Sequence, residues 1–316
     1  MTLRCAFVIL AVICVPAGAQ PYPARPITLV VPFSPGAAND ILARTLAAEL
    51  KPGLGAVVVD NKPGANGNIG ADLVRRSAPD GHTLLVAPNQ YVILAAMAPQ
   101  SYDFAKDFEP VVLSNRLPFF LVVNQEAVPA RSVKELLEFI RARPGKLSYA
   151  SAGNGSPHQL AMELLKLQAK LDVAHVPYKG MGQGVVDLLA GRTQMSITGY
   201  PAVAAHMKDG KLRILATAGA EKSALLPDAP PIADAVPGYE VDVWQGILAP
   251  KGTPGAVIEK LNAEFNRALK SPAIREKLAA QGIDTAGGTP QELRVKIASD
   301  LEKYARIVKA AGIKAD

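Results

Sequence analysis

Three loops in this sequence combine glycine with the start of a helical pattern. The first reads PFSPGAAND (residues 32–40), the second AGNGSPH (152–158) and the third KGMGQG (179–184), and each follows an apolar, strand-like run. The first turn of a helix carries unpaired N–H groups and the positive end of the helix dipole. Each loop could therefore bind an anion with backbone amides.

None of the three loops matches a nucleotide-binding motif. The first contains no Lys or Arg, and neither it nor the second has the Gly-Lys-Ser/Thr of a Walker A loop. In the third, Val185 stands where the last glycine of a dinucleotide fingerprint should fall. Short strand-to-helix connections also use Gly and Asn merely to turn. Three such loops at the carboxyl ends of strands nevertheless favour a carboxylate-binding cleft.

A secreted serine hydrolase that uses Ser151 or Ser156 with His158 is the alternative from another functional class. Ser156 and His158 are two residues apart, so on a helix they do not face each other. Ser156 followed by Pro157 is typical of a helix N-cap, and the nucleophile-elbow pattern G-x-S-x-G is absent.

Metal and acid–base chemistry find little support in the remaining residues. The 4 histidines are not spaced as a metal-binding pair on a helix, so we expect neither a metal site nor a cofactor. Asp40 stands in the first turn of its predicted helix, where a carboxylate favours the dipole. We expect it to brace the first loop rather than to transfer protons.

Composition places the chain among folded proteins with more than one domain. Its 316 residues are 49% hydrophobic, enough for two domains with separate cores. The net charge of +6 is spread without a basic block and aromatic residues make up only 5%, so no nucleic-acid partner is expected.

The N-terminal segment is typical of a secretory signal peptide. Residues 1–19 contain one early basic residue, an apolar run too short to span a bilayer, and a final A-x-A. Both cysteines, Cys5 and Cys14, fall within it. We therefore predict an exported mature chain without disulfides or cysteine chemistry.

Strand-like and helical patterns alternate after this segment, which predicts an α/β fold with parallel sheets covered by helices. A capping box at Ser132-Val-Lys-Glu135 starts one of the helices. Three helical patterns, from about Pro254, Ser271 and Pro290, end the chain with no strand between them. The predicted strands are 27–31, 56–60, 83–87, 109–113, 119–123, 146–151, 173–178, 194–198, 212–218 and 243–249.

Five ordered motifs carry a resemblance to a known family. They read YPARPITLVVPFSPGAANDILAR, VVVDNKPGANGNIGADLVRRSAPDGHTLLVA, LSYASAGNGSPHQLAMELL, HVPYKGMGQGVVDLLAGR and WQGILAPKGTPGAVIEKLNAEFNRAL. Together they resemble the extracytoplasmic solute receptors of tripartite tricarboxylate transporters, the Bug family, over essentially the whole mature chain.

This resemblance implies a two-lobed periplasmic binding protein of type II topology. Each lobe would hold a mostly parallel sheet flanked by helices, and two crossing segments would form the hinge. We place these crossings at FFLVVN and VWQGILAP. The first lobe is then predicted to comprise residues 20–122 with 246–316, and the second residues 123–245.

The resemblance also implies a receptor without catalytic activity. Such a monomer would capture a small organic carboxylate in the periplasm and deliver it to the membrane subunits of a tripartite tricarboxylate transporter. A receptor that signals to a sensor protein instead remains open. Carried over to this sequence, the ligand-binding residues implied are Phe33, Ser34, Gly36, Ala37, Asn39, Ser151, Gly153, Asn154, Gly155, Ser156, His158, Lys179, Gly180 and Thr198.

Two positions depart from the family pattern. The first loop of the family usually reads Pro-Gly-Gly, whereas Ala37 replaces the second glycine here, and alanine disfavours a positive φ. Members that bind amino acids commonly have an aspartate for the ammonium group where this chain has Thr198. We therefore expect a ligand without an α-ammonium, such as a dicarboxylate, a hydroxy acid or an aromatic acid.

Overall fold

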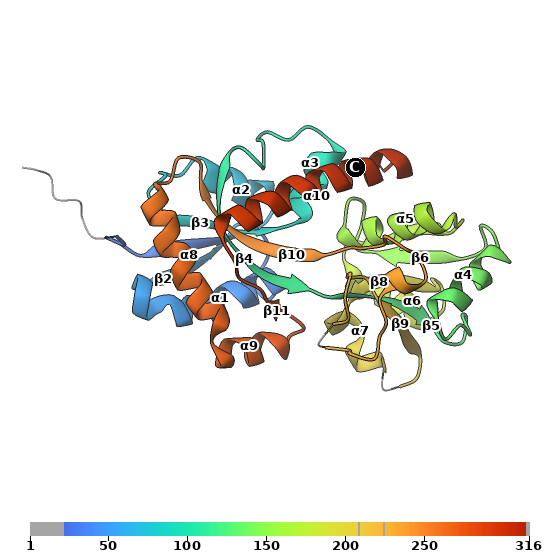
Figure 1. The fold of residues 1–316 in the computed structure, drawn as a ribbon. Coiled ribbons are helices and arrows are strands. Elements are labelled where there is room, and N and C mark those ends of the chain that lie inside the picture. Colours follow the sequence, from blue (N-terminus) through green and yellow to red (C-terminus); the bar gives the residue numbers. More distant parts are fainter. Residues whose placement is uncertain (1–21, 208, 224, 314–316) are drawn as a thin grey trace, which may run out of the picture.

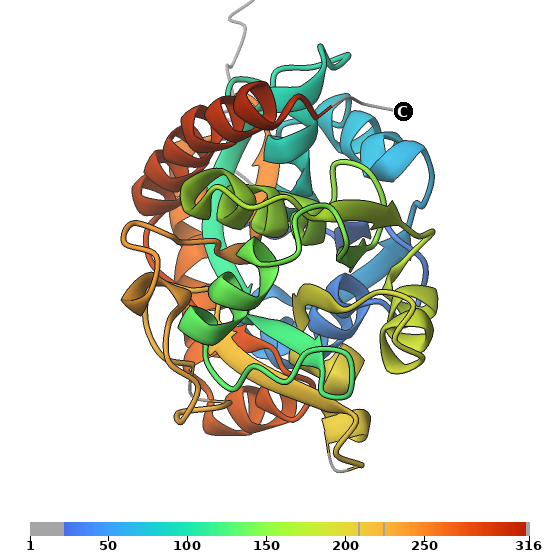
Figure 2. The ribbon, with the colours of Figure 1, turned by 90° about the vertical axis from the view of Figure 1, so that its right-hand side faces the viewer.

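The computed structural model describes residues 22–207, 209–223 and 225–313, and the predicted signal peptide with both cysteines lies outside them. Two α/β lobes lie side by side, joined by strands that run from one to the other (Figure 1). Figure 2 views the molecule with the second lobe nearest the reader and helix α10 along the upper edge.

The first lobe is built on a six-stranded sheet in the order β11-β4-β10-β3-β1-β2. Helices cover both of its faces, with α1, α8 and α9 on one and α2, α3 and α10 on the other. Its strands are β1 (Ile27–Val31), β2 (Val57–Asn61), β3 (Thr83–Pro88), β4 (Phe108–Leu117), β10 (Val243–Pro250) and β11 (Asp284–Thr285).

The helices of this lobe come from both ends of the described chain. They are α1 (Ala38–Leu54), α2 (Asn68–Arg75), α3 (Gln90–Met97), α8 (Gly255–Lys270), α9 (Pro272–Ala279) and α10 (Pro290–Ala311), with a 3₁₀ turn, η1 (Ala65–Gly67), before α2. Three helical patterns were predicted after residue 254, and α8, α9 and α10 confirm them. The prediction of no strand between them was wrong, because β11 pairs with the outer edge of β4.

The second lobe contains a five-stranded sheet in the order β7-β6-β8-β5-β9. The run β2-β1-β3-β10-β4 of the first sheet has the same arrangement. In both sheets the first four strands, counted along the chain from β1 or from β6, lie in the order second, first, third, fourth, and a crossing strand (β10 or β5) is inserted between the third and the fourth. The elements are β5 (Phe119–Asn124), α4 (Val133–Arg141), β6 (Ser148–Ser151), α5 (Pro157–Ala169), β7 (Ala174–Pro177), α6 (Met181–Leu189), β8 (Met195–Gly199), α7 (Tyr200–Met207), β9 (Leu212–Thr217) and η2 (Ile232–Asp234).

Two strands that run against the majority direction form the crossings between the lobes. In the first sheet β10 is antiparallel to β3 and β4, and in the second β5 is antiparallel to β8 and β9. Most other strands of each sheet share one direction, as predicted for this α/β class. The chain changes sheets at Pro118 and again before Val243, slightly earlier than the predicted boundaries at 122/123 and 245/246. The exact limits of the lobes remain a prediction.

Local sequence explains where the helices begin. Ser156 is the N-cap of α5 and accepts a hydrogen bond from Gln159 N, with Pro157 in the first turn, as predicted. Ser132 caps α4 in the same way, accepting from Glu135 N. Each side-chain cap satisfies an amide that has no partner inside its helix.

Helix α10 ties the two lobes together. It packs against α3 and β4 of the first lobe and against α5 of the second. Its Asp300 accepts a buried hydrogen bond of 2.6 Å from Trp244 Nε1 on β10. One continuous hydrophobic cluster therefore extends from Val30 in the first sheet to Leu121 in the second.

Candidate functional site

A compact hydrogen-bond network holds the first glycine loop. Asp40 Oδ2 accepts from Gly36 N at 2.9 Å and from Arg44 Nε at 3.0 Å, while Asp40 Oδ1 accepts from Asn61 Nδ2 at 3.0 Å. The same Asn61 amide donates to Phe33 O at 3.0 Å. Asp40 thus braces the loop, as predicted. Asn61 and Arg44 were missed, although Asn61 ends β2 at the same edge of the sheet.

Asp40 is held ionised by these contacts. Burial alone would raise its pKa, but the hydrogen bonds from Arg44, Gly36 and Asn61 outweigh burial, so the pKa lies below the ordinary value of 3.8. Arg44 is consequently engaged by Asp40 and by Asn61 Oδ1. The first loop presents dipoles rather than a free cation.

Helix α1 begins without a capping side chain. Its N-cap is Ala37, in an extended conformation with φ −71°, and the positive φ of the turn falls on Gly36 at +85°. Alanine at position 37 is therefore compatible with the turn. Because alanine has no side-chain acceptor, the amides of Ala38 and Asn39 in the first helical turn have no cap inside the helix.

The second loop is held by an internal network of its own. Gly153 N donates to Ser151 Oγ at 3.1 Å, and Gly155 N donates to Gln159 Oε1 at 2.8 Å. His175 links the two acceptors, with Nε2 2.6 Å from Ser151 Oγ and Nδ1 3.3 Å from Gln159 Nε2. These two glycine amides are engaged within the chain, as Gly36 N is in the first loop.

His158 lies beside this loop with an unused ring nitrogen. Its ring packs on Phe119 with centroids 4.8 Å apart, and burial lowers its pKa to about 4. The imidazole is therefore neutral at pH 7. Its buried Nδ1 has no hydrogen-bond partner within the described part of the chain.

Neither of the serine–histidine pairs predicted for a hydrolase, Ser151 or Ser156 with His158, is hydrogen-bonded within the described part of the chain. Ser156 Oγ caps α5 and donates to Gly153 O at 2.7 Å. Ser151 contacts His175, which the sequence analysis did not select, rather than His158. The hydrolase alternative is thus not supported.

The third loop contributes another uncapped helix. Gly180 is the N-cap of α6, with φ +121° and open space around its α-carbon, and Lys179 before it is exposed. Thr198 lies near the carboxyl end of β8, fully buried, opposite Phe120 on β5. These residues belong to the second lobe, like the second loop.

The lobes touch where the second loop meets α3. A β-carbon placed on Gly155 would lie 2.5 Å from Met97 Sδ, and the φ of Gly155 is +70°. Only glycine fits this approach without displacing the methionine. The second loop of one lobe thus lies directly against a helix of the other.

Eight buried side-chain polar atoms of the described residues have no hydrogen-bond partner, among them His82 Nδ1 and Thr193 Oγ1. Three predicted residues contribute Asn39 Nδ2, His158 Nδ1 and Thr198 Oγ1. Three unpredicted residues contribute Asn89 Oδ1, Asn115 Nδ2 and Gln245 Oε1, all without partners among the residues described. Burying such an atom unpaired costs about 1–3 kcal/mol, so a bound polar molecule would relieve a real penalty.

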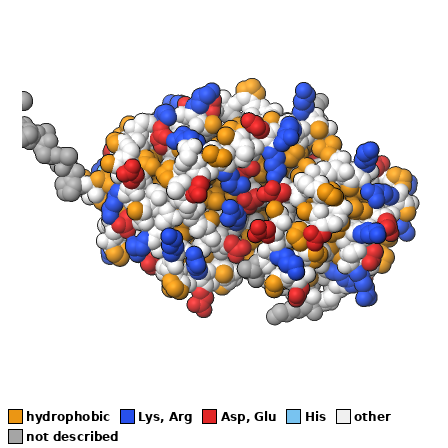
Figure 3. Space-filling model, viewed as in Figure 1, with side chains coloured by type: hydrophobic (Ala, Val, Ile, Leu, Met, Phe, Trp, Pro, Cys, Tyr) orange, Lys and Arg blue, Asp and Glu red, His pale blue; other side chains and the backbone are white. Residues whose placement is uncertain are grey.

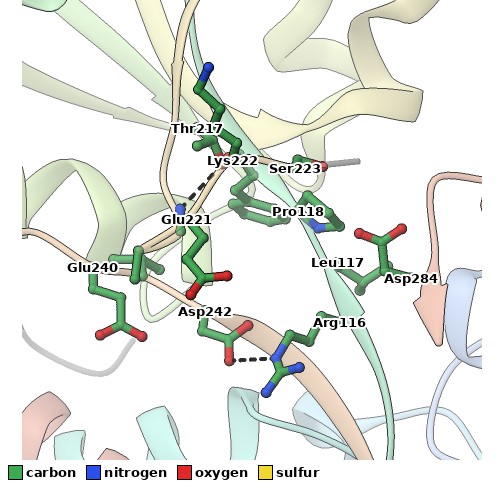
Figure 4. Close-up of a pocket in the computed structure, with 14 residues that line it drawn as sticks. Arg116, Leu117, Pro118, Thr217, Glu221, Lys222, Ser223, Glu240, Asp242 and Asp284 are labelled. Atoms are coloured by element: carbon green, nitrogen blue, oxygen red, sulfur yellow. Dashed lines mark hydrogen bonds and ion pairs between the residues drawn. The ribbon is translucent and has the colours of Figure 1, made fainter. Parts of the chain in front are cut away.

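A separate groove of about 350 Å³ runs along the hinge, lined by residues of both lobes. Figure 4 shows Arg116 bonded to Asp242 there, with Glu221, Glu240 and Asp284 nearby. Acidic side chains gather where the lobes meet on the face seen in Figure 3. None of the predicted ligand-binding residues lines this groove.

Residues 22–207, 209–223 and 225–313 were searched for metal-binding clusters and for membrane-spanning helices. No group of three or more His, Cys, Asp or Glu side chains within these ranges could hold a metal ion. No helix within them is both long and apolar enough to cross a bilayer.

A family model described as the tripartite tricarboxylate transporter family receptor matches residues 42–313. The chain belongs to this receptor family. It is 38% identical over 313 residues to Protein BugT of Bordetella pertussis, an alignment that covers 98% of this chain and 96% of BugT.

Solved structures of similar proteins have the same architecture. This family member is 35% identical to Rpa4515 of R. palustris, solved with adipate, with a TM-score of 0.79 over 93% of this chain and 99% of that one. It is 30% identical to MatC of Rhodopseudomonas palustris, solved with bound malate, with a TM-score of 0.75 over 91% of this chain and 100% of that one. The predicted two-lobed fold and the predicted family are confirmed.

The Asp40 network generates a pH-dependent stability prediction. We expect Asp40→Asn to lower the free energy of unfolding at pH 7 by about 1–3 kcal/mol, because an amide cannot accept from Gly36, Arg44 and Asn61 together. The folded-state pKa is depressed, so this stabilisation exists above pH 3.8 and is lost as the pH falls through the folded-state pKa. Urea unfolding of both proteins from pH 7 to pH 3 measures the difference.

Asp60→Asn is the matched control. Asp60 is 40% exposed and pairs only with Lys62, so we expect a change within about 0.5 kcal/mol. An Asp40→Asn deficit that stays constant down to pH 3 would contradict the network's charge dependence.

Proposed function

We propose that this protein is a periplasmic receptor that captures a small organic carboxylate between its lobes and delivers it to the membrane subunits of a tripartite tricarboxylate-type transporter. The observation that carries the proposal is the set of unpartnered atoms on Asn39, His158 and Thr198, which come from both lobes. Family membership and the adipate and malate held by two similar proteins support it.

Carboxylate recognition would rest on dipoles. The uncapped first turns of α1 and α6 offer amide N–H groups and positive dipole ends from opposite lobes. A carboxylate needs only a few such donors, and an anion held without a buried cation is released readily. The proposed contacts are Phe33, Ser34, Gly36, Ala37, Asn39, Ser151, Gly153, Asn154, Gly155, Ser156, His158, Lys179, Gly180 and Thr198.

The ligand is proposed to lack an α-ammonium group. An ammonium would need an acidic partner, but Thr198 occupies the position expected for it and Asp40 is committed to Arg44 and Asn61. We place the working protein in the periplasm as a monomer, exported by the N-terminal segment predicted to be a signal peptide.

A panel of carboxylates tests the receptor function directly. At a concentration 100-fold above Kd, a ligand that binds only the folded state stabilises it by about 2.7 kcal/mol, which is visible as a rise in Tm. We expect organic acids to raise the Tm and amino acids to leave it unchanged in a thermal-shift screen. Tight binding of aspartate or glutamate with inert organic acids would refute the ligand class.

A serine-reactive fluorophosphonate probe tests the competing hydrolase. We expect no labelling of the folded protein and no turnover of generic esterase substrates, because Ser156 serves as a helix cap and no hydrogen bond joins His158 to Ser151 or Ser156 among the described residues. Labelling that disappears in Ser151→Ala, with trypsin as the positive control, would revive the alternative.

Asn39 offers a test of the first loop. Asn39→Leu removes an amide whose Nδ2 has no partner in the described structure, so we expect a change in unfolding free energy within about 1 kcal/mol. Affinity for the best carboxylate of the panel should fall about tenfold by isothermal titration calorimetry.

Asn61→Leu is the control for that variant. Its Nδ2 is used internally by Phe33 and Asp40, so this variant should lose stability as well as affinity. Wild-type affinity in Asn39→Leu would remove Asn39 from the binding site.

A further inference from the structure

The side chain of Gln245 projects from the face of the first sheet that is covered by α1, the helix that follows the first glycine loop. Residues of β10 alternate, with Trp244 and Leu248 in the cluster under α10, and Ile247 and Ala249 in the cluster under α1. Gln245 shares the parity of Ile247 and is only 1% exposed. Its Oε1 has no partner in the described chain.

Asn115 pairs with Gln245 on the neighbouring antiparallel strand β4, next to a register shift between Gln245 and Gly246. Paired residues of this kind point to the same side of a sheet, with β-carbons about 4.5–5.5 Å apart. Asn115 is 0% exposed, its Oδ1 is 3.0 Å from Ser114 Oγ, and its Nδ2 has no partner among described residues. A donor and an acceptor without partners in the described structure therefore belong to residues paired across adjacent strands.

These two amides lie at the ligand end of the sheet. Gln245 is also paired with Pro88, the last residue of β3, so it stands at the edge where the loops lie. Helix α1, which carries Asn39 in its first turn, covers the same face. Along the crossing strand, Asn115 lies four residues before Phe119, the contact of His158, so the two positions are at most about 13 Å apart.

Two charged residues adjoin this pair along the strands, Arg116 on β4 and Asp284 on β11. Arg116, the next residue, is exposed and turned into the hinge groove, where it pairs with Asp242 (Figure 4). A carboxylate beside the pair would face the Gln245 acceptor without a cation to offset the repulsion. A hydroxyl both accepts and donates, and so it satisfies Asn115 Nδ2 and Gln245 Oε1 together.

We propose that Asn115 and Gln245 form a hydroxyl-specific subsite at the hinge, so that this receptor selects carboxylates that also carry a hydroxyl. The inference rests on the proposed receptor function and sharpens its ligand class from carboxylate to hydroxy carboxylate. Asn115 and Gln245 determine specificity, whereas the glycine loops bind the carboxylate.

Matched pairs of acids test the subsite in the wild-type protein. Calorimetry would compare glycolate with acetate, 3-hydroxypropionate with propionate, 4-hydroxybutyrate with butyrate, and malate with succinate. We expect the tightest-binding acid to carry a hydroxyl and its deoxy analogue to bind at least about tenfold more weakly, because that analogue leaves two buried groups unpaired.

Gln245→Met removes the acceptor at similar side-chain volume. We expect it to bind the hydroxy acid about tenfold more weakly while its affinity for the deoxy analogue is unchanged. Gln194→Met is the control for the same chemical change, because the Gln194 amide is used internally by Ser148 and Gly191, away from β10. It should leave the preference for the hydroxyl intact.

Each remaining outcome counts against a defined claim. Equal affinities for hydroxy acids and their analogues in the wild type would overturn the subsite, with a structural water then satisfying the pair, and leave the receptor function standing. Equal losses for both acids in Gln245→Met would also overturn it, as a merely structural effect. No binding by any acid of the pairs or of the wider panel would overturn the receptor function itself.

Discussion

The N–H groups in the first turn of a helix have no acceptor inside that helix, and the site proposed for this receptor depends on that deficit. Where the chain supplies a side chain, as Ser156 does for α5, the helix start is self-sufficient. Where Ala37 and Gly180 stand at the cap, α1 and α6 keep unfilled donors. Helices α1 and α6 belong to different lobes, so an anion that engages both must lie between them.

Hydrogen-bond networks hold the loops around these donors, and in the first lobe they pair the nearby charged side chains with each other. Asp40 and Arg44 neutralise each other while holding Gly36 and, through Asn61, Phe33. In the second lobe, Ser151, His175 and Gln159 hold the glycine loop without any ion pair. The loops proposed to bind the ligand are consequently held by dipoles and by charges that neutralise each other, which suits a receptor that must release its ligand.

The crossing strands combine mechanical and chemical roles. Antiparallel β10 and β5 let each lobe keep the same strand order while the chain passes twice between them. The passage brings Asn115 and Gln245, two buried amides, to the carboxyl edge of the first sheet. Polar residues at such positions are costly unless a ligand or water uses them.

Sequence by itself determined the local structure of this protein. Apolar runs marked each strand of four or more residues, Ser156 marked a cap, and Asp40 was recognised as a brace, because periodicity and capping depend on neighbours a few residues away. The five ordered motifs were sufficient for the family. Among the described strands only β11 was not predicted, because a two-residue strand has no recognisable sequence pattern and forms through its pairing with β4.

Tertiary structure decided which distant residues serve those local features. Asn61 reaches the first loop from 28 positions beyond Phe33, and His175 reaches Ser151 from 24 positions away. Gln245 meets Asn115 only because β10 returns to the first sheet after the whole second lobe. Such contacts depend on strand order and register. A register shift of one residue would turn each side chain of a strand to the opposite face of the sheet, and no short stretch of sequence encodes the register.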